Sequence, residues 1–114
     1  MILFDTDSVI EMLREKRHEA GAISTITLIE VLRGTGAEKR SRVKILLEEC
    51  FNLLDLDNRV IETYCNLYDS LRAEGTLIPD ADLLIAATAI SHDKALRTGD
   101  EHFQRLEKLG LKLT

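Results

Sequence analysis

The sequence has few of the residues that interrupt or loosen a chain. It contains one proline and six scattered glycines in 114 residues, a composition that indicates neither disorder nor low complexity. Hydrophobic residues make up 45% of the chain and charged residues 31%. A chain of this length can bury a core without disulfides or a structural metal. We therefore expect a single domain over residues 1–114, without internal repeats or linkers.

Long apolar runs are also absent. The longest strongly apolar stretch, Asp82 to Ile90, is far shorter than the roughly 20 residues that cross a membrane as a helix. The N-terminus carries acids where a signal peptide would be basic. These features predict a cytoplasmic protein that does not associate with membranes.

Cysteine and histidine are too sparse to form a zinc site. The two cysteines, Cys50 and Cys65, lack the spacing of paired metal ligands, and each falls on the apolar side of a predicted helix. This pattern predicts buried thiols without chemistry. The three histidines, His18, His92 and His102, are scattered, which predicts solvated side chains.

Basic residues are outnumbered by acidic ones, and the formal net charge is -5. Because Lys and Arg supply most of the affinity for nucleic-acid phosphates, the charge disfavours broad, unaided binding to nucleic acid. A nucleic-acid substrate would require metal ions. One basic stretch follows residue 32, and its Arg33, Lys39 and Arg40 are candidates for binding phosphates, the alternative being a solvated helix face.

Short apolar segments alternate with segments of helical periodicity. Strands are predicted at residues 2–4, 22–24, 51–56, 95–98 and 111–113, and helices at residues 8–14, 25–33, 37–50, 60–71, 83–90 and 101–108. This alternation predicts an α/β fold with a parallel central sheet of four or five short strands flanked by helices. Ligands of such sheets bind at the carboxyl ends of the strands.

Four carboxylates stand at the edges of the apolar segments: Asp5, Glu30, Asp82 and Asp100. Each has a simple structural alternative, since the aspartates can cap helices and Glu30 can pair with Arg33. If the fold brings them together, their charges require hydrogen-bond donors, raised pKa values or bound cations. Oxygen ligands without cysteine or convergent histidine favour Mg²⁺ or Mn²⁺.

Two further acids lie beside these candidates. Of Asp5 and Asp7, one is expected to cap the following helix and the other to face inward, and the position at the strand end favours Asp5 as the inward group. Of Asp80 and Asp82, one is expected to cap the next helix. Asp82 is the better ligand candidate because it directly precedes the apolar residues.

Four segments carry a recognisable pattern: ILFDTD at 2–7, ISTITLIEVLRG at 23–34, DLLIAATA at 82–89 and LRTGDEHF at 96–103. In order and spacing they resemble the PIN-domain nucleases, and more narrowly the VapC-type toxins of toxin-antitoxin pairs. The resemblance runs nearly from end to end of the chain. The sequence departs from the family at Asp7, where Asn or Ser is common.

The resemblance implies an activity and a set of site residues. It makes Asp5, Glu30, Asp82 and Asp100 the acidic quartet that holds Mg²⁺ or Mn²⁺, with Thr98 as a supporting hydroxyl. It further implies metal-dependent endonucleolytic cleavage of RNA, for which the basic residues Arg33, Lys39 and Arg40 remain our own candidates for holding phosphates. The expected partners are a second copy of the chain and a small VapB-like antitoxin that inserts a segment at the active site.

Other interpretations of the same residues remain open. The segment LFDTDSV at 3–9 also resembles the first motif of haloacid-dehalogenase-like phosphatases, which would make Asp5 a nucleophile. The chain is short for that fold, and Glu30 and Asp82 would have no role. A non-enzymatic receiver-like domain would use Asp55 or Asp57 as phosphoacceptor. A nuclease domain that only binds is disfavoured because all four acids are present.

Overall fold

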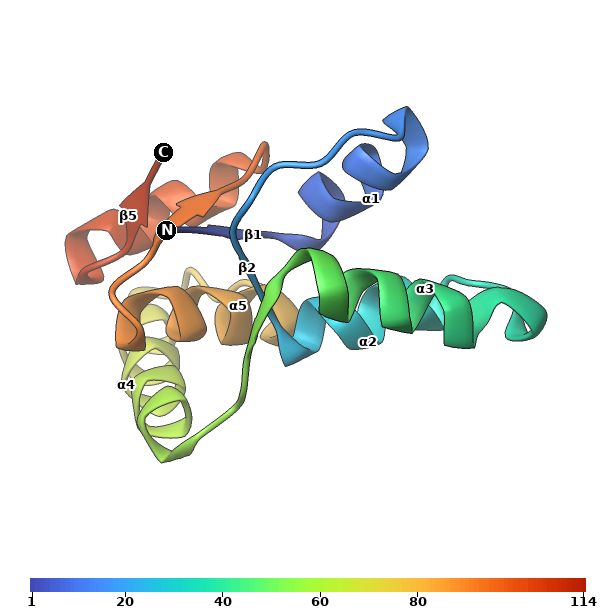
Figure 1. The fold of residues 1–114 in the computed structure, drawn as a ribbon. Helices are drawn as coiled ribbons and strands as arrows, with labels where there is room; N and C mark the ends of the chain where they lie inside the picture. Colours follow the sequence, from blue (N-terminus) through green and yellow to red (C-terminus); the bar gives the residue numbers. More distant parts are fainter.

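Five short parallel strands form the centre of the molecule in a computed structural model that describes residues 1–114 (Figure 1). The strands are β1 (Ile2–Phe4), β2 (Ala22–Ser24), β3 (Asn52–Leu54), β4 (Ala95–Arg97) and β5 (Lys112–Leu113). Their order in the sheet is β3-β2-β1-β4-β5, and every neighbouring pair is parallel. The predicted sheet is confirmed, and β1 lies at its middle.

Helices cover both faces of the sheet. They are α1 (Thr6–Glu15), α2 (Thr25–Arg33), α3 (Ala37–Cys50), α4 (Asn58–Glu74), α5 (Asp80–Ser91) and a 3-10 helix, η1 (Glu101–Leu109). In Figure 1, α1 and η1 lie above the sheet and α2, α3 and α5 below it. The predicted helices are all present, but the last one takes the tighter 3-10 form.

The core follows from the alternation of side chains along the strands. Leu3 belongs to a buried cluster with residues of α4, α5 and η1, while the next residue, Phe4, belongs to a second cluster with residues of α1, α2 and α3. Both side chains are almost completely buried. The strand β1 therefore joins two apolar clusters, which fixes the position of the residue that follows it.

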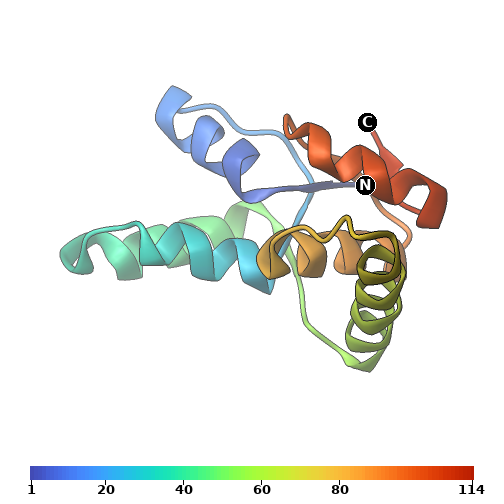
Figure 2. The same ribbon diagram turned by 180° about the vertical axis from the view of Figure 1, so that it is seen from behind.

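The helix α5 is apolar on all sides, as its sequence predicts. Six of its twelve residues are buried, because α2, β4 and α4 all contact it. The longer helix α4 crosses α5 steeply, and the two views agree on this arrangement (Figure 2). No helix of the structure is both long enough and apolar enough to span a membrane.

Two expectations about side chains are wrong. Neither Asp80 nor Asp82 caps α5, because the helix begins at Asp80 and its N-cap residue is Pro79, with no side-chain hydrogen bond at the cap. The thiols are not buried either: Cys65 is exposed and Cys50 is half-buried. Helical spacing places residues on a face, but it does not say whether another element covers that face.

Candidate functional site

The four predicted carboxylates come from four different elements that meet at one edge of the sheet. Asp5 directly follows β1, and Asp100 comes three residues after β4, the strand next to β1. Glu30 lies on α2 and Asp82 in the first turn of α5. The strands β2 and β3 lie on one side of β1, and β4 and β5 lie on the other, so the strand order reverses at β1. The carboxyl ends of the strands beside such a point commonly form ligand sites.

Asp5 is the most buried of the four, with 5% of its surface exposed. One carboxylate oxygen, Oδ1, accepts a hydrogen bond from the Ser8 backbone N–H at 2.9 Å and caps α1. The other, Oδ2, accepts a hydrogen bond from the Thr98 hydroxyl. The expected division of roles with Asp7 is therefore wrong: Asp5 is both the cap and the inward group, and Asp7 is exposed.

Glu30 is oriented by a hydroxyl that the sequence analysis overlooked. The Thr6 hydroxyl donates a 2.6 Å hydrogen bond to Glu30 Oε1. The alternative partner, Arg33, lies 3.8 Å from Glu30 Oε2, and its side chain is 74% exposed, so this ion pair contributes little. Thr6 directly follows Asp5, and its position in the first turn of α1 is the signal that could have identified it.

Asp82 and Asp100 lie beside a histidine. The ring of His102 places Nε2 3.0 Å from Asp82 Oδ2 and Nδ1 3.1 Å from Asp100 Oδ1. One ligand atom from each of the three residues lies within 4.8 Å of the others. The prediction that His102 is solvated is wrong. His102 lies in the first turn of η1, two residues after Asp100, and its ring contacts both Asp82 and Asp100.

Asp80 belongs to a different contact. Its Oδ1 accepts a 2.6 Å hydrogen bond from the Tyr64 hydroxyl of α4. This hydrogen bond, together with burial and the negative charge of Asp80, raises the pKa of Tyr64 to about 12. Of the two candidates for the third acid of the cluster, Asp80 contacts Tyr64, whereas Asp82 lies beside the other acids. Asp82 is therefore the acid that belongs to the cluster.

The electrostatics of Asp82 show that the cluster is crowded. Burial raises the pKa of the Asp82 carboxyl, the His102 ring partly offsets this, and the charges of Glu30, Asp100 and Asp5 raise it further. A divalent cation would relieve this repulsion, and the donor set of carboxylate oxygens fits the ligand preference of Mg²⁺ and Mn²⁺. The residues present therefore fit a metal site.

The basic candidates lie farther along the α2–α3 hairpin. Arg33 is on α2, one turn after Glu30, and Lys39 is exposed at the start of α3. Arg40 has a structural contact, since its Nε and Nη2 donate hydrogen bonds at 3.1 Å to the carbonyl groups of Leu32 and Thr35 at the end of α2. Binding of phosphates by these three residues stays a prediction.

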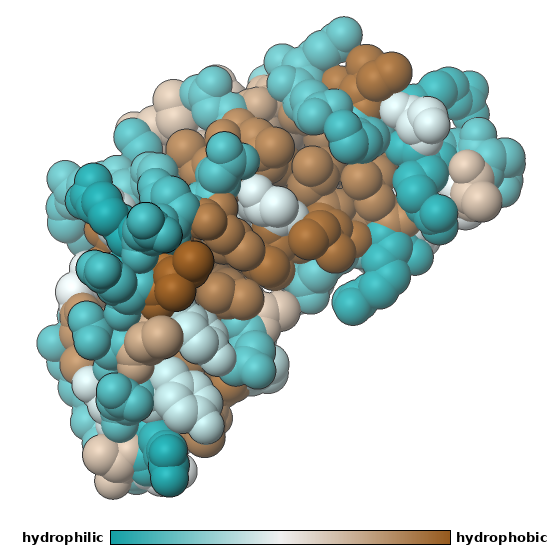
Figure 3. Space-filling view, turned by 90° about the horizontal axis from the view of Figure 1, so that it is seen from below, coloured by the Kyte–Doolittle hydropathy of each residue, from teal (hydrophilic) through white to brown (hydrophobic).

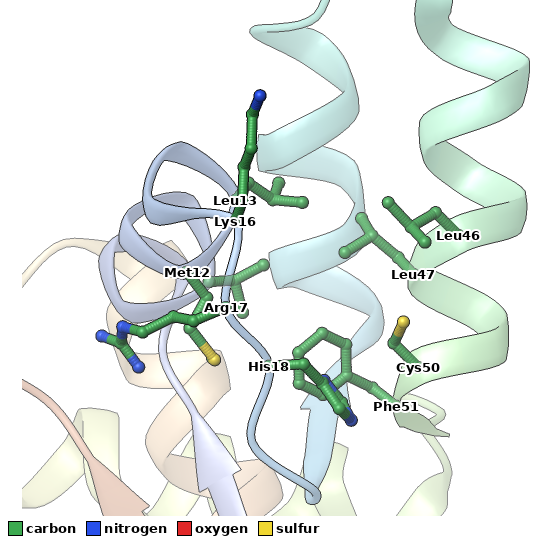
Figure 4. Close-up of a pocket in the computed structure, with 10 residues that line it drawn as sticks. Met12, Leu13, Lys16, Arg17, His18, Leu46, Leu47, Cys50 and Phe51 are labelled. Atoms are coloured by element: carbon green, nitrogen blue, oxygen red, sulfur yellow. The ribbon is translucent and has the colours of Figure 1, made fainter.

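An apolar cavity of about 320 Å³ lies away from the acids, between α1 and α3 (Figure 4). Met12 and Leu13 approach it from α1, and Leu46 and Leu47 from α3 (Figure 4). None of the four carboxylates lines it. Of the four acids, Asp100 lines a separate open depression together with Asp7, Gly99 and Glu101.

A sequence model of the PIN domain family matches residues 2–109 of the chain. The chain belongs to the PIN domain family. This membership confirms the resemblance and removes the grounds for a haloacid-dehalogenase-like or receiver-like fold. The α/β fold with a parallel central sheet is the fold that the sequence predicted.

Individual relatives of this PIN domain protein carry ribonuclease names. It is 38% identical over 116 residues to Ribonuclease VapC1 of Methanocaldococcus jannaschii, and the aligned region covers 98% of this chain and 85% of the relative. It is 34% identical over 87 residues to Ribonuclease VapC4 of Mycobacterium tuberculosis, and the aligned region covers 71% of this chain and 67% of that relative. Its structure is similar to VapBC-1 from nontypeable Haemophilus influenzae, with a TM-score of 0.85, 25% identity and coverage of 100% and 97%.

Proposed function

We propose that this PIN domain protein is a metal-dependent endoribonuclease and the toxin of a VapBC-type toxin-antitoxin pair, with residues 1–114 acting as one catalytic unit. The observation that carries the proposal is the convergence of Asp5, Glu30, Asp82 and Asp100 at one edge of the sheet. The ribonuclease names of the two VapC relatives support RNA as the substrate.

In this proposal the four carboxylates hold Mg²⁺ or Mn²⁺. When bound, such an ion lowers the pKa of a coordinated water and offsets charge on a phosphate. The chain itself orients the ligands: Ser8 N–H and the Thr98 hydroxyl hold Asp5, and the Thr6 hydroxyl holds Glu30. These hydrogen bonds leave each carboxylate with one preferred direction, which a precise metal site requires.

RNA would be held in part by basic residues of α2 and α3. Arg33 is exposed one turn beyond Glu30, and Lys39 is exposed on α3. Arg33 would give up only its 3.8 Å ion pair with Glu30 to reach a phosphate. Arg40 would contribute less, because it already binds two carbonyl groups. The small number of available cations agrees with the net charge of -5 and with a substrate held mainly through metal.

Two protein partners follow from the same family. An antitoxin is supported by the similarity to VapBC-1 and by the apolar cavity between α1 and α3, which a partner segment can cover. A homodimer is supported by the apolar band across one face of the molecule (Figure 3) and by Ile29 of α2, which is 52% exposed. Exposed apolar areas of this kind favour protein contacts.

The proposal is tested by RNA cleavage with purified protein in Mg²⁺ or Mn²⁺. Asp5→Asn and Asp82→Asn should each lower the rate by roughly 100-fold or more, since even an outer-shell partner of a metal is worth roughly 10–100-fold. Asp69→Asn, which changes an exposed acid on α4, should keep full activity. The products should carry 5′-phosphate and 3′-hydroxyl ends.

Removal of metal completes this test. EDTA should abolish cleavage by the wild-type protein, and excess Mg²⁺ or Mn²⁺ should restore it. Cleavage that continues in EDTA, or full activity in both site variants, would contradict the proposal. Folding of each variant is checked by circular dichroism, so that loss of activity is not confused with loss of structure.

A further inference from the structure

His102 lies in the acidic cluster, and it is the only histidine close in sequence to one of the four acids. Its ring lies between Asp82 and Asp100, and 22% of its side chain is exposed. The other two histidines are elsewhere: His18 packs against Phe51, and His92 lies near Asp57. We propose that His102 is a direct nitrogen ligand of the metal ion, an inference that rests on the proposed function and makes the site selective for Mn²⁺ over Mg²⁺.

The first argument is the state of the Nε2 atom. It is shielded from solvent and lies 3.0 Å from Asp82 Oδ2, yet the contact lacks the alignment of a hydrogen bond. A buried polar atom without a hydrogen-bond partner is costly. Two ligand atoms on one edge of an octahedron around a small divalent cation are about 3.0 Å apart, since the bonds are about 2.1 Å long. The observed separation is therefore suited to one shared cation.

The second argument is how the other nitrogen is held. Nδ1 lies 3.1 Å from Asp100 Oδ1, and the same oxygen accepts a hydrogen bond from the His102 backbone N–H. Both ring nitrogens lie beside a carboxylate, but once Asp82 binds a cation, Asp100 is the one that remains to accept the ring proton. A proton on Nδ1 leaves the lone pair on Nε2, the usual arrangement of histidines that bind metals. Asp100 Oδ2 is left free to act as a ligand itself.

The third argument is that the ring has little freedom to turn away. The next residue, Phe103, is 1% exposed and anchors η1 in the core. The rings of His102 and Phe103 pack with their centroids 4.8 Å apart. A ring fixed by packing and by a carboxylate presents Nε2 in one direction, toward Asp82, as a metal ligand must.

A nitrogen ligand changes which ion the site prefers. Mn²⁺ is the weakest binder in the first-row transition series, but as a member of it Mn²⁺ accepts a nitrogen ligand more readily than Mg²⁺, which strongly prefers oxygen ligands and keeps its waters. Four carboxylates alone would serve either ion. With His102 added, Mn²⁺ gains a bond that Mg²⁺ does not use, so the difference in affinity between the two ions measures the contribution of this side chain.

The decisive measurement is pulsed electron paramagnetic resonance of Mn²⁺ bound to the full chain without RNA. We expect a ¹⁴N coupling in the wild-type protein that becomes a ¹⁵N coupling when histidine is labelled with ¹⁵N. The coupling should disappear in His102→Ala and persist in His92→Ala, which removes a histidine outside the cluster. Circular dichroism establishes that both variants are folded.

Affinities provide an independent measurement by calorimetry. In His102→Ala, the Kd for Mn²⁺ should rise roughly tenfold, at the lower end of what a lost contact at a metal site costs. The Kd for Mg²⁺ should change less than the Kd for Mn²⁺. In His92→Ala neither should change. Equal weakening of both ions would indicate that His102 only holds the carboxylates in place, and would overturn the inference.

The inference and the proposed function fail in different ways. If Mn²⁺ binds to the wild-type protein, is lost in Asp82→Asn, but shows no nitrogen coupling, then His102 is not a ligand while the metal site stands. If neither ion binds more tightly to the wild-type protein than to Asp82→Asn, the proposed metal site itself is wrong, and the inference falls with it.

Discussion

At the scale of single residues, hydroxyl groups decide where the carboxylates point. Thr98 donates to Asp5, and Thr6 donates to Glu30. The family resemblance predicted a supporting role for Thr98, but nothing in the sequence pattern singled out Thr6. The donor that orients an acid depends on the angle between α1 and α2, and that angle is set by the packing of Val9, Leu28 and Val31 in one apolar cluster.

Asp82 makes the metal-free protein less stable at neutral pH. Burial and the neighbouring acids raise its pKa above the ordinary value of 3.8. A carboxyl whose pKa is higher in the folded chain than in the unfolded chain ionises more easily when unfolded, so its charge opposes folding above the raised pKa. The penalty decreases as the pH falls through the raised pKa and is absent below the ordinary one.

We therefore expect Asp82→Asn to raise the melting temperature of the protein in EDTA at pH 7, with a gain that disappears near pH 3.5. Asp69→Asn should show no such pH-dependent gain. With saturating metal the order should reverse, since an ion at 100 times its Kd stabilises the wild-type protein by about 2.7 kcal/mol. A lower melting temperature of Asp82→Asn in EDTA at pH 7 would contradict this account of the cluster.

At the scale of elements, a hydrogen bond joins α4 to the beginning of α5. Tyr64 of α4 donates to Asp80 in the first turn of α5, two residues before Asp82. The contact turns the Asp80 carboxylate away from the other acids. Tyr64 also stacks on Tyr68, with ring centroids 6.2 Å apart. The sequence predicts a helix over residues 60–71, but it does not predict which acid Tyr64 contacts.

The high pKa of Tyr64 can be measured directly, because the chain has two tyrosines and no tryptophan. In Tyr68→Phe, Tyr64 is the only phenol, and its ultraviolet absorbance should titrate at about pH 12 while circular dichroism reports a folded protein. The raised pKa means that the hydrogen bond stabilises the fold below about pH 10 and is lost as the pH approaches 12.

Asp80→Asn in the Tyr68→Phe background is the matched control. Without the carboxylate, the Tyr64 pKa should fall toward the ordinary value of 10.0. RNA cleavage by Asp80→Asn should remain within about threefold of the wild-type rate, because surface changes away from a site have small effects on structure. Titration of Tyr64 near pH 10 in both proteins would show that the hydrogen bond does not form in solution.

At the scale of the whole molecule, the acids and the apolar surfaces are separated. The acids lie at one edge of the sheet, whereas the apolar cavity lies between α1 and α3 (Figure 4) and an apolar band crosses one face (Figure 3). The apolar surfaces therefore offer a protein partner contacts outside the acidic cluster, in addition to the segment that the family resemblance places at the active site. A side chain of the cavity can be changed without changing the four acids.

Leu46→Glu tests this separation. Leu46 lines the apolar cavity and is 45% exposed, so a charge there should be tolerated by the fold but not by an apolar partner segment. Coexpressed with the antitoxin encoded beside its own gene, the variant should bind at least roughly tenfold more weakly than the wild-type chain, since burial of one leucine contributes about 1.5–3 kcal/mol. Its RNA cleavage should be unchanged.

Unchanged affinity of Leu46→Glu for the antitoxin would contradict this prediction. If Leu46→Glu keeps its affinity for the antitoxin, the cavity between α1 and α3 is not the contact surface. The matched control is Ile61→Glu, which places a charge at an equally exposed apolar residue of α4 and should leave antitoxin binding intact.

Local patterns in the sequence were sufficient for the strands and the helices, and with the family resemblance they singled out four acids that the fold brings to the same end of the sheet. Strand alternation and helical spacing depend only on neighbouring residues, and the family pattern preserves the order of the acids along the chain. The beginning of α5 differs from the prediction by three residues, at an end of an element, where capping contacts decide the outcome. The last helix has nearly its predicted bounds, but it takes the 3-10 form.

Only the tertiary structure decided which side chains share a partner. Asp5 acts as cap and inward group at once, Asp80 turns to Tyr64, Arg40 binds the end of α2, and His102 enters the acidic cluster. Most of these contacts join residues on different elements. The others join a residue to an acid two or three positions away, at the turn where a helix begins. Their formation depends on how the helices pack against the sheet, and no short window of sequence contains that information.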